Sequence, residues 1–276
     1  MMNIFAKLLL FLQKTMDTPP SYGAFHLFSV LIVIGVTVML CTKLRHADEK
    51  AVRRVLLIAW IVMVALEIYR QIVFTFEVSE AGVISADYSW YAFPFQLCST
   101  PLYVLPFAVF AKNGHVRDAA ISFLCTFSLF GGLVVMIYPN DVFVSTIGIN
   151  IQTMVHHGLQ VALGIFLAVH NRHRLSVSHF LVALPMFATL VATAMLLNIN
   201  VYHALTTRGM SDTFNMFFVS PYHPCTLPIL STVYEIVPYP VFLFIYLIGF
   251  SLAAAVVYSV FYAITSPVRK NCHAEA

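Results

Sequence analysis

Residues 147–170 read IGINIQTMVHHGLQVALGIFLAVH, a stretch that contains no Lys, Arg, Asp or Glu. About 20 predominantly apolar residues are enough for a helix to cross a bilayer, and this stretch meets that requirement. Six other stretches are comparably long and apolar: residues 25–42, 55–76, 93–111, 119–138, 180–198 and 239–264. The sequence therefore predicts an all-α polytopic membrane protein, a single bundle of about seven transmembrane helices.

The composition agrees with a membrane protein and argues against other classes. Hydrophobic residues make up 60% of the chain and charged residues only 10%, whereas a soluble domain carries roughly 25% charged residues. The 276 residues leave room for one transmembrane domain, over residues 1–276, and for no soluble module. The net charge of +3 is scattered and does not indicate a nucleic-acid partner. The five cysteines have no CxxC or other metal spacing and fall in different segments, so neither a zinc knuckle nor a disulfide framework is indicated. We expect no cofactor.

The charges of the connections predict the orientation in the cell membrane. Basic residues crowd the first, third and fifth connections and the C-terminal tail: Lys43, Arg45, Lys50, Arg53, Arg54, Lys112, Arg117, Arg172, Arg174, Arg269 and Lys270. The other connections are mainly acidic or neutral, with Glu77, Glu80, Asp87, Asp141, Arg208, Asp212 and Glu235. By the positive-inside rule the N-terminus lies outside and the C-terminus is cytoplasmic. Residues 4–12 are too short to span, so residues 1–24 are predicted to form an interfacial segment.

A thiol and a pair of histidines lie within these apolar stretches. Cys98 follows the string FPFQL, and His156 and His157 stand in QTMVHHG. Ionisable groups are expensive at membrane depth, and so they suggest a functional site. A rise of about 1.5 Å per helical residue places them in the outer half of the bilayer, together with Glu67. We therefore predict a polar pocket that opens to the outer leaflet or to the outer water.

Residue spacing suggests how these groups face one another. Gln152, His156 and Gln160 recur every four residues and so share one face of a helix. A lone buried thiol stays protonated, and Cys98 would need an imidazole to act as a nucleophile. Pro94 suits the first turn of a helix over residues 93–111, with Cys98 one turn later. Pro101 removes the usual partner of the Leu97 carbonyl and loosens the helix beside the thiol.

The string at residues 93–99, FPFQLCS, resembles the LPLHLCS signature of bacterial YwaF-like membrane proteins, relatives of the eukaryotic transmembrane protein 164 acyltransferases. Further similarities follow in the same order along most of the chain: His26-Leu27, Glu67-Ile68, Gly131-Gly132, Pro139, Asp141, His157-Gly158 and Asn215-Met216-Phe217. The chain departs from the pattern at Gln96, where the family usually has His, and its Asn215 string is offset by one residue.

The resemblance implies a phospholipid acyltransferase that works through a cysteine thioester. The nucleophile would be Cys98 and the general base His157, the histidine that precedes a glycine. Phospholipid and lysophospholipid would be the substrates and the bilayer the surroundings. Supporting roles are open to His156, Gln96, Glu67, His26, Gln152 and Asn215, and an oxyanion donor is to be sought among Gln96, Ser99, Thr100, Gln152 and Asn215.

Other interpretations of the same residues remain open. Free cysteine often behaves as a small buried hydrophobe, and Glu67 with Arg70 can form an ion pair without a catalytic role. A metal-dependent lipid hydrolase would gather zinc ligands from His26, His156, His157, Glu67, His203 and His223, although no HxxxH or HExxH spacing supports it. A transporter or receptor would also have buried polar groups, but no repeated segment is found.

The longest connection, residues 201–238, is interrupted by prolines and yet is rich in apolar residues. Such a segment is expected to fold over the outer mouth of the bundle or to dip into the interface. We predict that it forms an outer loop, either a lid or a guide for an acyl chain.

Overall fold

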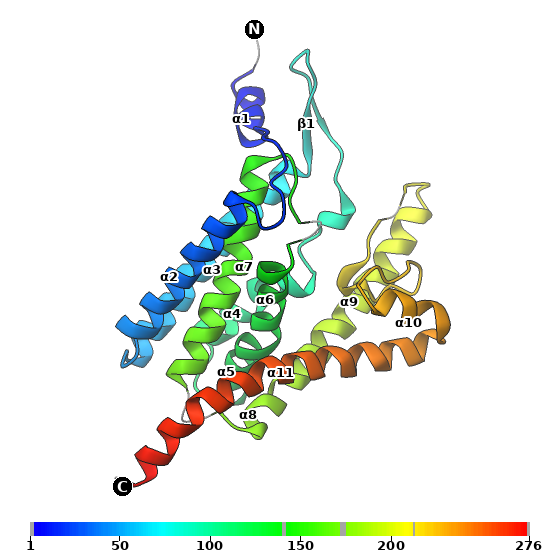
Figure 1. Ribbon diagram of the computed structural model, residues 1–276. Coiled ribbons are helices and arrows are strands. Elements are labelled where there is room, and N and C mark those ends of the chain that lie inside the picture. The colour runs from blue at the N-terminus through cyan, green and yellow to red at the C-terminus, as the bar shows by residue number, and fades with distance from the viewer. Residues whose placement is uncertain (1–2, 140–141, 172–174, 212, 275–276) are drawn as a thin grey trace.

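The computed structural model of the chain describes residues 3–139, 142–171, 175–211 and 213–274, with side chains described up to Ala263. Its helices run antiparallel through most of the chain (Figure 1). They are α1 (Ile4–Leu12), α2 (Ala24–Lys43), α3 (Glu49–Val73), α4 (Pro101–Phe110), α5 (His115–Phe123), α6 (Leu129–Ile137), α7 (Ile147–His170), α8 (Val177–Leu181), α9 (Ala183–Thr206), α10 (Leu230–Ile236) and α11 (Tyr239–Ala274).

Among the described residues, five helices are long and apolar enough to cross a membrane. They are Ala24–Lys43, His115–Ile137, Ile147–His170, Val177–Thr206 and Tyr239–Ala263. The prediction of an all-α, multi-pass membrane protein is confirmed at this level. Helices α3 and α4 occupy the second and third expected stretches, so the number of seven and the orientation of the termini stay predictions. The charged residues Asp141, Arg172, Arg174 and Asp212, on which the orientation partly rests, lie outside the described residues.

The third stretch is not the continuous helix predicted over residues 93–111. Regular α-helix begins only at Pro101, and Cys98 lies before it in a 3₁₀ turn, η2 (Leu97–Ser99). The reason is chemical, because a proline has no N–H and is favoured at the first position of a helix. The Leu97 carbonyl accepts instead from the backbone N–H of Thr100 at 3.3 Å and from its Oγ1 at 2.6 Å. Pro94 precedes the helix and lies outside it.

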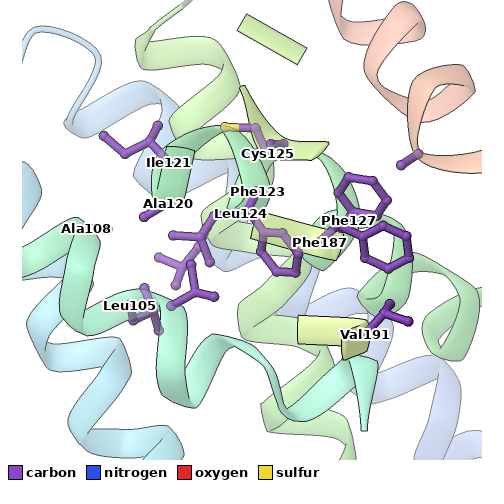
Figure 2. Packing of buried hydrophobic residues seen from close by; sticks show 14 of the residues in the cluster. Leu105, Ala108, Ala120, Ile121, Phe123, Leu124, Cys125, Phe127, Phe187 and Val191 are labelled. Atoms are coloured by element: carbon purple, nitrogen blue, oxygen red, sulfur yellow. The ribbon is translucent and has the colours of Figure 1, made fainter. Parts of the chain in front are cut away.

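The core lies where α5 and α6 pack against α7, α9 and α11. A π-helical turn, η3 (Leu124–Ser128), joins α5 to α6, and Figure 2 shows the aromatic packing beside it. The rings of Phe127 and Phe187 stack with centroids 4.2 Å apart. Gly164 of α7 lets η3 approach closely, since a Cβ there would lie 2.9 Å from the Leu124 carbonyl oxygen. Tight packing of this kind stabilises helices in lipid, where apolar burial alone gives little.

One end of the bundle carries α1 and a small hairpin that the sequence did not predict (Figure 1). Strands β1 (Phe76–Val78) and β2 (Ile84–Ala86) pair antiparallel. The α1 segment is tied to this end by Gln13, whose Nε2 donates to the Phe76 carbonyl at 2.5 Å, and by the Leu12 carbonyl, which accepts from Tyr69 Oη at 2.8 Å. We call this end the α1 end.

Two arginines cap the C-terminal end of α4. The last carbonyls of a helix lack partners within it, and here Arg53 donates to the Val109 and Ala111 carbonyls while Arg117 Nε donates to the Ala108 carbonyl at 3.0 Å. Arg117 is buried and pairs with Glu49 at 2.6 Å. This network fixes the short helix that follows the Cys98 turn.

Candidate functional site

The Cys98 turn faces the polar stripe of α7. Its backbone carbonyl accepts hydrogen bonds from His156 Nε2 and Gln160 Nε2, each 2.9 Å long. The Cys98 side chain is partly buried. Gln152, which is buried one turn before His156 on α7, completes the stripe that the spacing predicted. The structure thus brings together the Cys98 turn and the part of α7 that carries His156.

Hydrogen bonds to carbonyl groups assign the protons of both imidazoles. A carbonyl oxygen only accepts, so the ring nitrogen that meets it carries the proton and the other nitrogen has a free lone pair. His156 donates through Nε2 to Cys98, and His157 donates through Nδ1 to the Thr153 carbonyl at 2.7 Å. The other nitrogens, His156 Nδ1 and His157 Nε2, are buried without a partner. Each of the two adjacent histidines therefore has one ring nitrogen that is free to accept a proton.

The contact to Cys98 is made through its backbone, and the sulfur is bonded to neither imidazole nitrogen. The two rings lie edge to face with their centroids 5.7 Å apart. The two side chains that donate to the Cys98 carbonyl fix the position of the turn.

Glu67 forms the predicted ion pair with Arg70, at 3.1 Å, in the last part of α3. Gln71 Nε2 donates to the same carboxylate oxygen at 2.6 Å, and both Arg70 and Gln71 donate to the Ala92 carbonyl. The ion pair and Gln71 therefore anchor the segment before Cys98.

His26 has a structural environment of its own. Its Nδ1 accepts from the Tyr22 backbone N–H at 3.2 Å, and its Nε2 donates to the Met136 carbonyl at 3.0 Å, which joins the start of α2 to the end of α6. His203 pairs with Tyr222 in the outer connection. Within the part of the chain that the structure describes, no three His, Cys, Asp or Glu side chains lie close enough to hold a metal ion. The zinc alternative thus has no ligand set there.

The connection between α9 and α10 lies against the Cys98 segment. Gln96 Nε2 donates to the Asn215 carbonyl at 2.9 Å, and Gln96 Oε1 accepts from the Phe217 N–H at 2.7 Å. The Asn198 amide donates to the carbonyl of the neighbouring Met216 and accepts from the Met216 N–H. The Asn215 amide is committed within the loop, to Pro224 and Ser220. The departure from the family pattern at Gln96 thus supplies a clamp for this loop.

Sequence reasoning missed the role of Asn198, because its partners are backbone groups. The loop has a strained backbone at this point, since Phe217 and Phe218 have φ values of 57° and 56°. Bulky residues adopt the left-handed region only where their surroundings enforce it, and such strain is common at functional sites. Gln96 and Asn198 provide that enforcement.

Replacing Gln96 with alanine is expected to loosen the loop over residues 213–219. The buried Phe217 N–H would lose its acceptor, at a cost of about 1–3 kcal/mol. Hydrogen exchange measured by mass spectrometry should show faster exchange in this peptide. The control is Asn200→Ala, because Asn200 Nδ2 bonds only within its own helix, to Leu196. Equal exchange in the two variants would contradict the clamp.

The sequence comparisons agree with this architecture. The family model described as the TMEM164 family matches residues 21–262, which include the Cys98 turn, the histidine helix and the clamped loop. Neither the search of curated proteins nor that of solved structures found a match. A match over most of the chain establishes membership, and so this multi-pass membrane protein belongs to the TMEM164 family.

Proposed function

We propose that the protein is a phospholipid acyltransferase of the cell membrane in which Cys98 carries the acyl chain as a thioester. The observation that supports this most is that the Cys98 turn is hydrogen-bonded to His156, next to His157 on α7, and that one ring nitrogen of each buried imidazole has no partner. A nucleophilic cysteine needs such a base. A purely structural role does not explain the unpaired His156 Nδ1 and His157 Nε2, because buried polar atoms are normally hydrogen-bonded.

His157 is the better candidate for the base. Its Nδ1–H is held by the Thr153 carbonyl, which leaves Nε2 as the acceptor, and a base oriented by a third group is the usual arrangement around an activated nucleophile. His156 donates its Nε2–H to the Cys98 carbonyl, and Gln160 donates to the same carbonyl. We assign His156 and Gln160 to positioning of the turn.

The proposed reaction has two balanced steps. The Cys98 thiol gives its proton to His157, the sulfur attacks an ester carbonyl, and the C–O bond breaks as the leaving glycerol oxygen takes that proton. A lysophospholipid hydroxyl then gives its proton to His157 and attacks the thioester, and the thiolate that leaves recovers the proton. Exclusion of water from a membrane-embedded site favours transfer over hydrolysis.

The direct test is the intact mass of protein purified from native membranes. We expect a fraction of the chain to carry a fatty acyl mass that hydroxylamine removes, and peptide mapping should place it on Cys98. The adduct should be absent from Cys98→Ala. The matched control is Cys225→Ala, which removes a buried thiol of the loop between α9 and α10 and should leave the adduct on Cys98.

An adduct that persists in Cys98→Ala, or one that maps to another cysteine, would contradict the assignment. So would wild-type protein that never carries an acyl mass after incubation with phospholipid vesicles. Transfer of a labelled chain to added lysophospholipid distinguishes a transferase from a hydrolase, because a hydrolase would release free fatty acid instead.

A further inference from the structure

A groove of about 420 Å³ lies between α3 and α4. From α3 it is lined by Val64, Glu67, Ile68 and Gln71, and from the other wall by Pro94 and Leu102, among others. The two walls belong to the elements that hold the ion pair and the Cys98 turn. The groove is thus part of the surroundings of the proposed site, although Cys98 itself does not line it.

The polarity of the groove changes along its length. The polar residues Glu67, Gln71 and Thr75 line the part towards the α1 end, together with the apolar Ile72 and Phe76, and the deeper part is bounded by Val64 and Leu102. From Gln71 to Val64 the helix rises by about 10 Å. A glycerophospholipid has the same order of polarity, with its headgroup and esters at the interface and its chains in the hydrocarbon.

The groove opens sideways to the bilayer. Ile68, in its wall, is 57% exposed, and Tyr103, across from it, is 38% exposed. Below the groove both helices continue with exposed apolar side chains such as Ile61 and Phe107. Large exposed apolar residues on membrane helices face lipid, so a lipid could enter between α3 and α4 without crossing water.

Proximity to the thiol selects this groove over another. In the sequence Cys98 lies between Pro94 and Leu102, which both line the groove. Glu67 lines it too, and its partner Arg70 donates to the Ala92 carbonyl before the Cys98 turn. A second groove, of about 260 Å³, lies between α2 and α7 and is lined by Val155 and Gly158, among others. Gly158 is two residues from His156, about 200° around the helix, so that groove faces away from the site.

We infer that the α3–α4 groove holds one glycerophospholipid taken laterally from the bilayer, with its ester region beside Glu67 and Gln71 and one chain along Val64, Ile68 and Leu102. This inference rests on the proposed function for its purpose, since it places the acyl donor beside Cys98. The binding itself does not require the reaction.

The test uses a phosphatidylcholine with a diazirine on one acyl chain, reconstituted with the full chain in phosphatidylcholine vesicles. After irradiation, peptide mass spectrometry should find adducts on Val64, Ile68 and Leu102. Ile68→Trp fills the groove and is expected to lower this labelling roughly tenfold, the change produced by about 1.4 kcal/mol of lost binding. Ile61→Trp is the matched control, because Ile61 lies on the same face of α3, is 54% exposed and does not line the groove.

Labelling that is unchanged in Ile68→Trp, or that centres on Ile32 and Val36 of the α2–α7 groove, would overturn the inference. The Cys98→Ala variant tests the lipid site independently of the proposed function. It should be labelled in the α3–α4 groove as the wild type is. If the groove is labelled but the protein never carries an acyl mass, the lipid site is supported and the proposed acyltransferase function is contradicted. An acyl mass on Cys98 with labelling elsewhere would overturn the groove alone.

Discussion

Replacing His157 with alanine is expected to slow acyl transfer by roughly 10²–10⁴-fold, the contribution typical of a positioned general base. The Thr153 carbonyl fixes the proton on Nδ1, so Nε2 is the lone pair that receives the thiol proton. Without it, Cys98 stays a protonated thiol in apolar surroundings. The measurement is the rate at which vesicle-bound protein transfers a labelled acyl chain to lysophospholipid, with the acyl mass on Cys98 as a second readout.

Two other histidines of α7 serve as comparisons. His156→Ala is expected to slow transfer only about tenfold, because Gln160 still holds the Cys98 carbonyl and one lost hydrogen bond is worth about 1.4 kcal/mol. His170→Ala should leave the rate unchanged, since His170 ends the same helix, about 20 Å from His157. If His156→Ala were the slower enzyme, the role of base would pass to His156.

The sequence predicted the membrane helices well where apolar character alone decides them. The stretch at residues 147–170 coincides with α7, because no proline or charge interrupts it. Prediction failed at residues 93–111, where apolar character continues but Pro101 forces the α-helix to begin late. It also missed the π-helical turn at Leu124–Ser128, which depends on packing against α7 and has no periodic signature in the sequence.

The residues of the candidate site were predictable but their partners were not. Cys98, His156 and Gln160 stand out because polar groups are rare in apolar stretches. Their partners are largely backbone carbonyls, such as those of Cys98 and Thr153. Every residue has a carbonyl, so the amino-acid sequence does not mark the ones that accept. For the same reason the hydrogen bond from Asn198 to the Met216 carbonyl was not predictable.

Replacing Gly132 with alanine is expected to lower the stability of the protein. A Cβ at this position of α6 would lie 2.8 Å from the His157 carbonyl oxygen and 2.8 Å from the Gln160 Cβ, both on α7. Backbone cannot rotate away as a side chain can, so the two helices must separate. Overpacking of this kind typically costs about 1–3 kcal/mol. Thermal unfolding of the purified protein in detergent should show a lower midpoint.

Two further glycines separate loss of packing from loss of the site. Gly249→Ala, where nothing lies within 4 Å of the new Cβ, should not lower the midpoint, and better helix propensity favours a small rise. Gly164→Ala clashes with Leu129 and the Leu124 carbonyl and should lower the midpoint as Gly132→Ala does. Only Gly132→Ala displaces the backbone of His157, so at a temperature where all three stay folded it alone should slow acyl transfer. Equal rates in Gly132→Ala and Gly164→Ala would show that the reaction does not depend on where His157 is held.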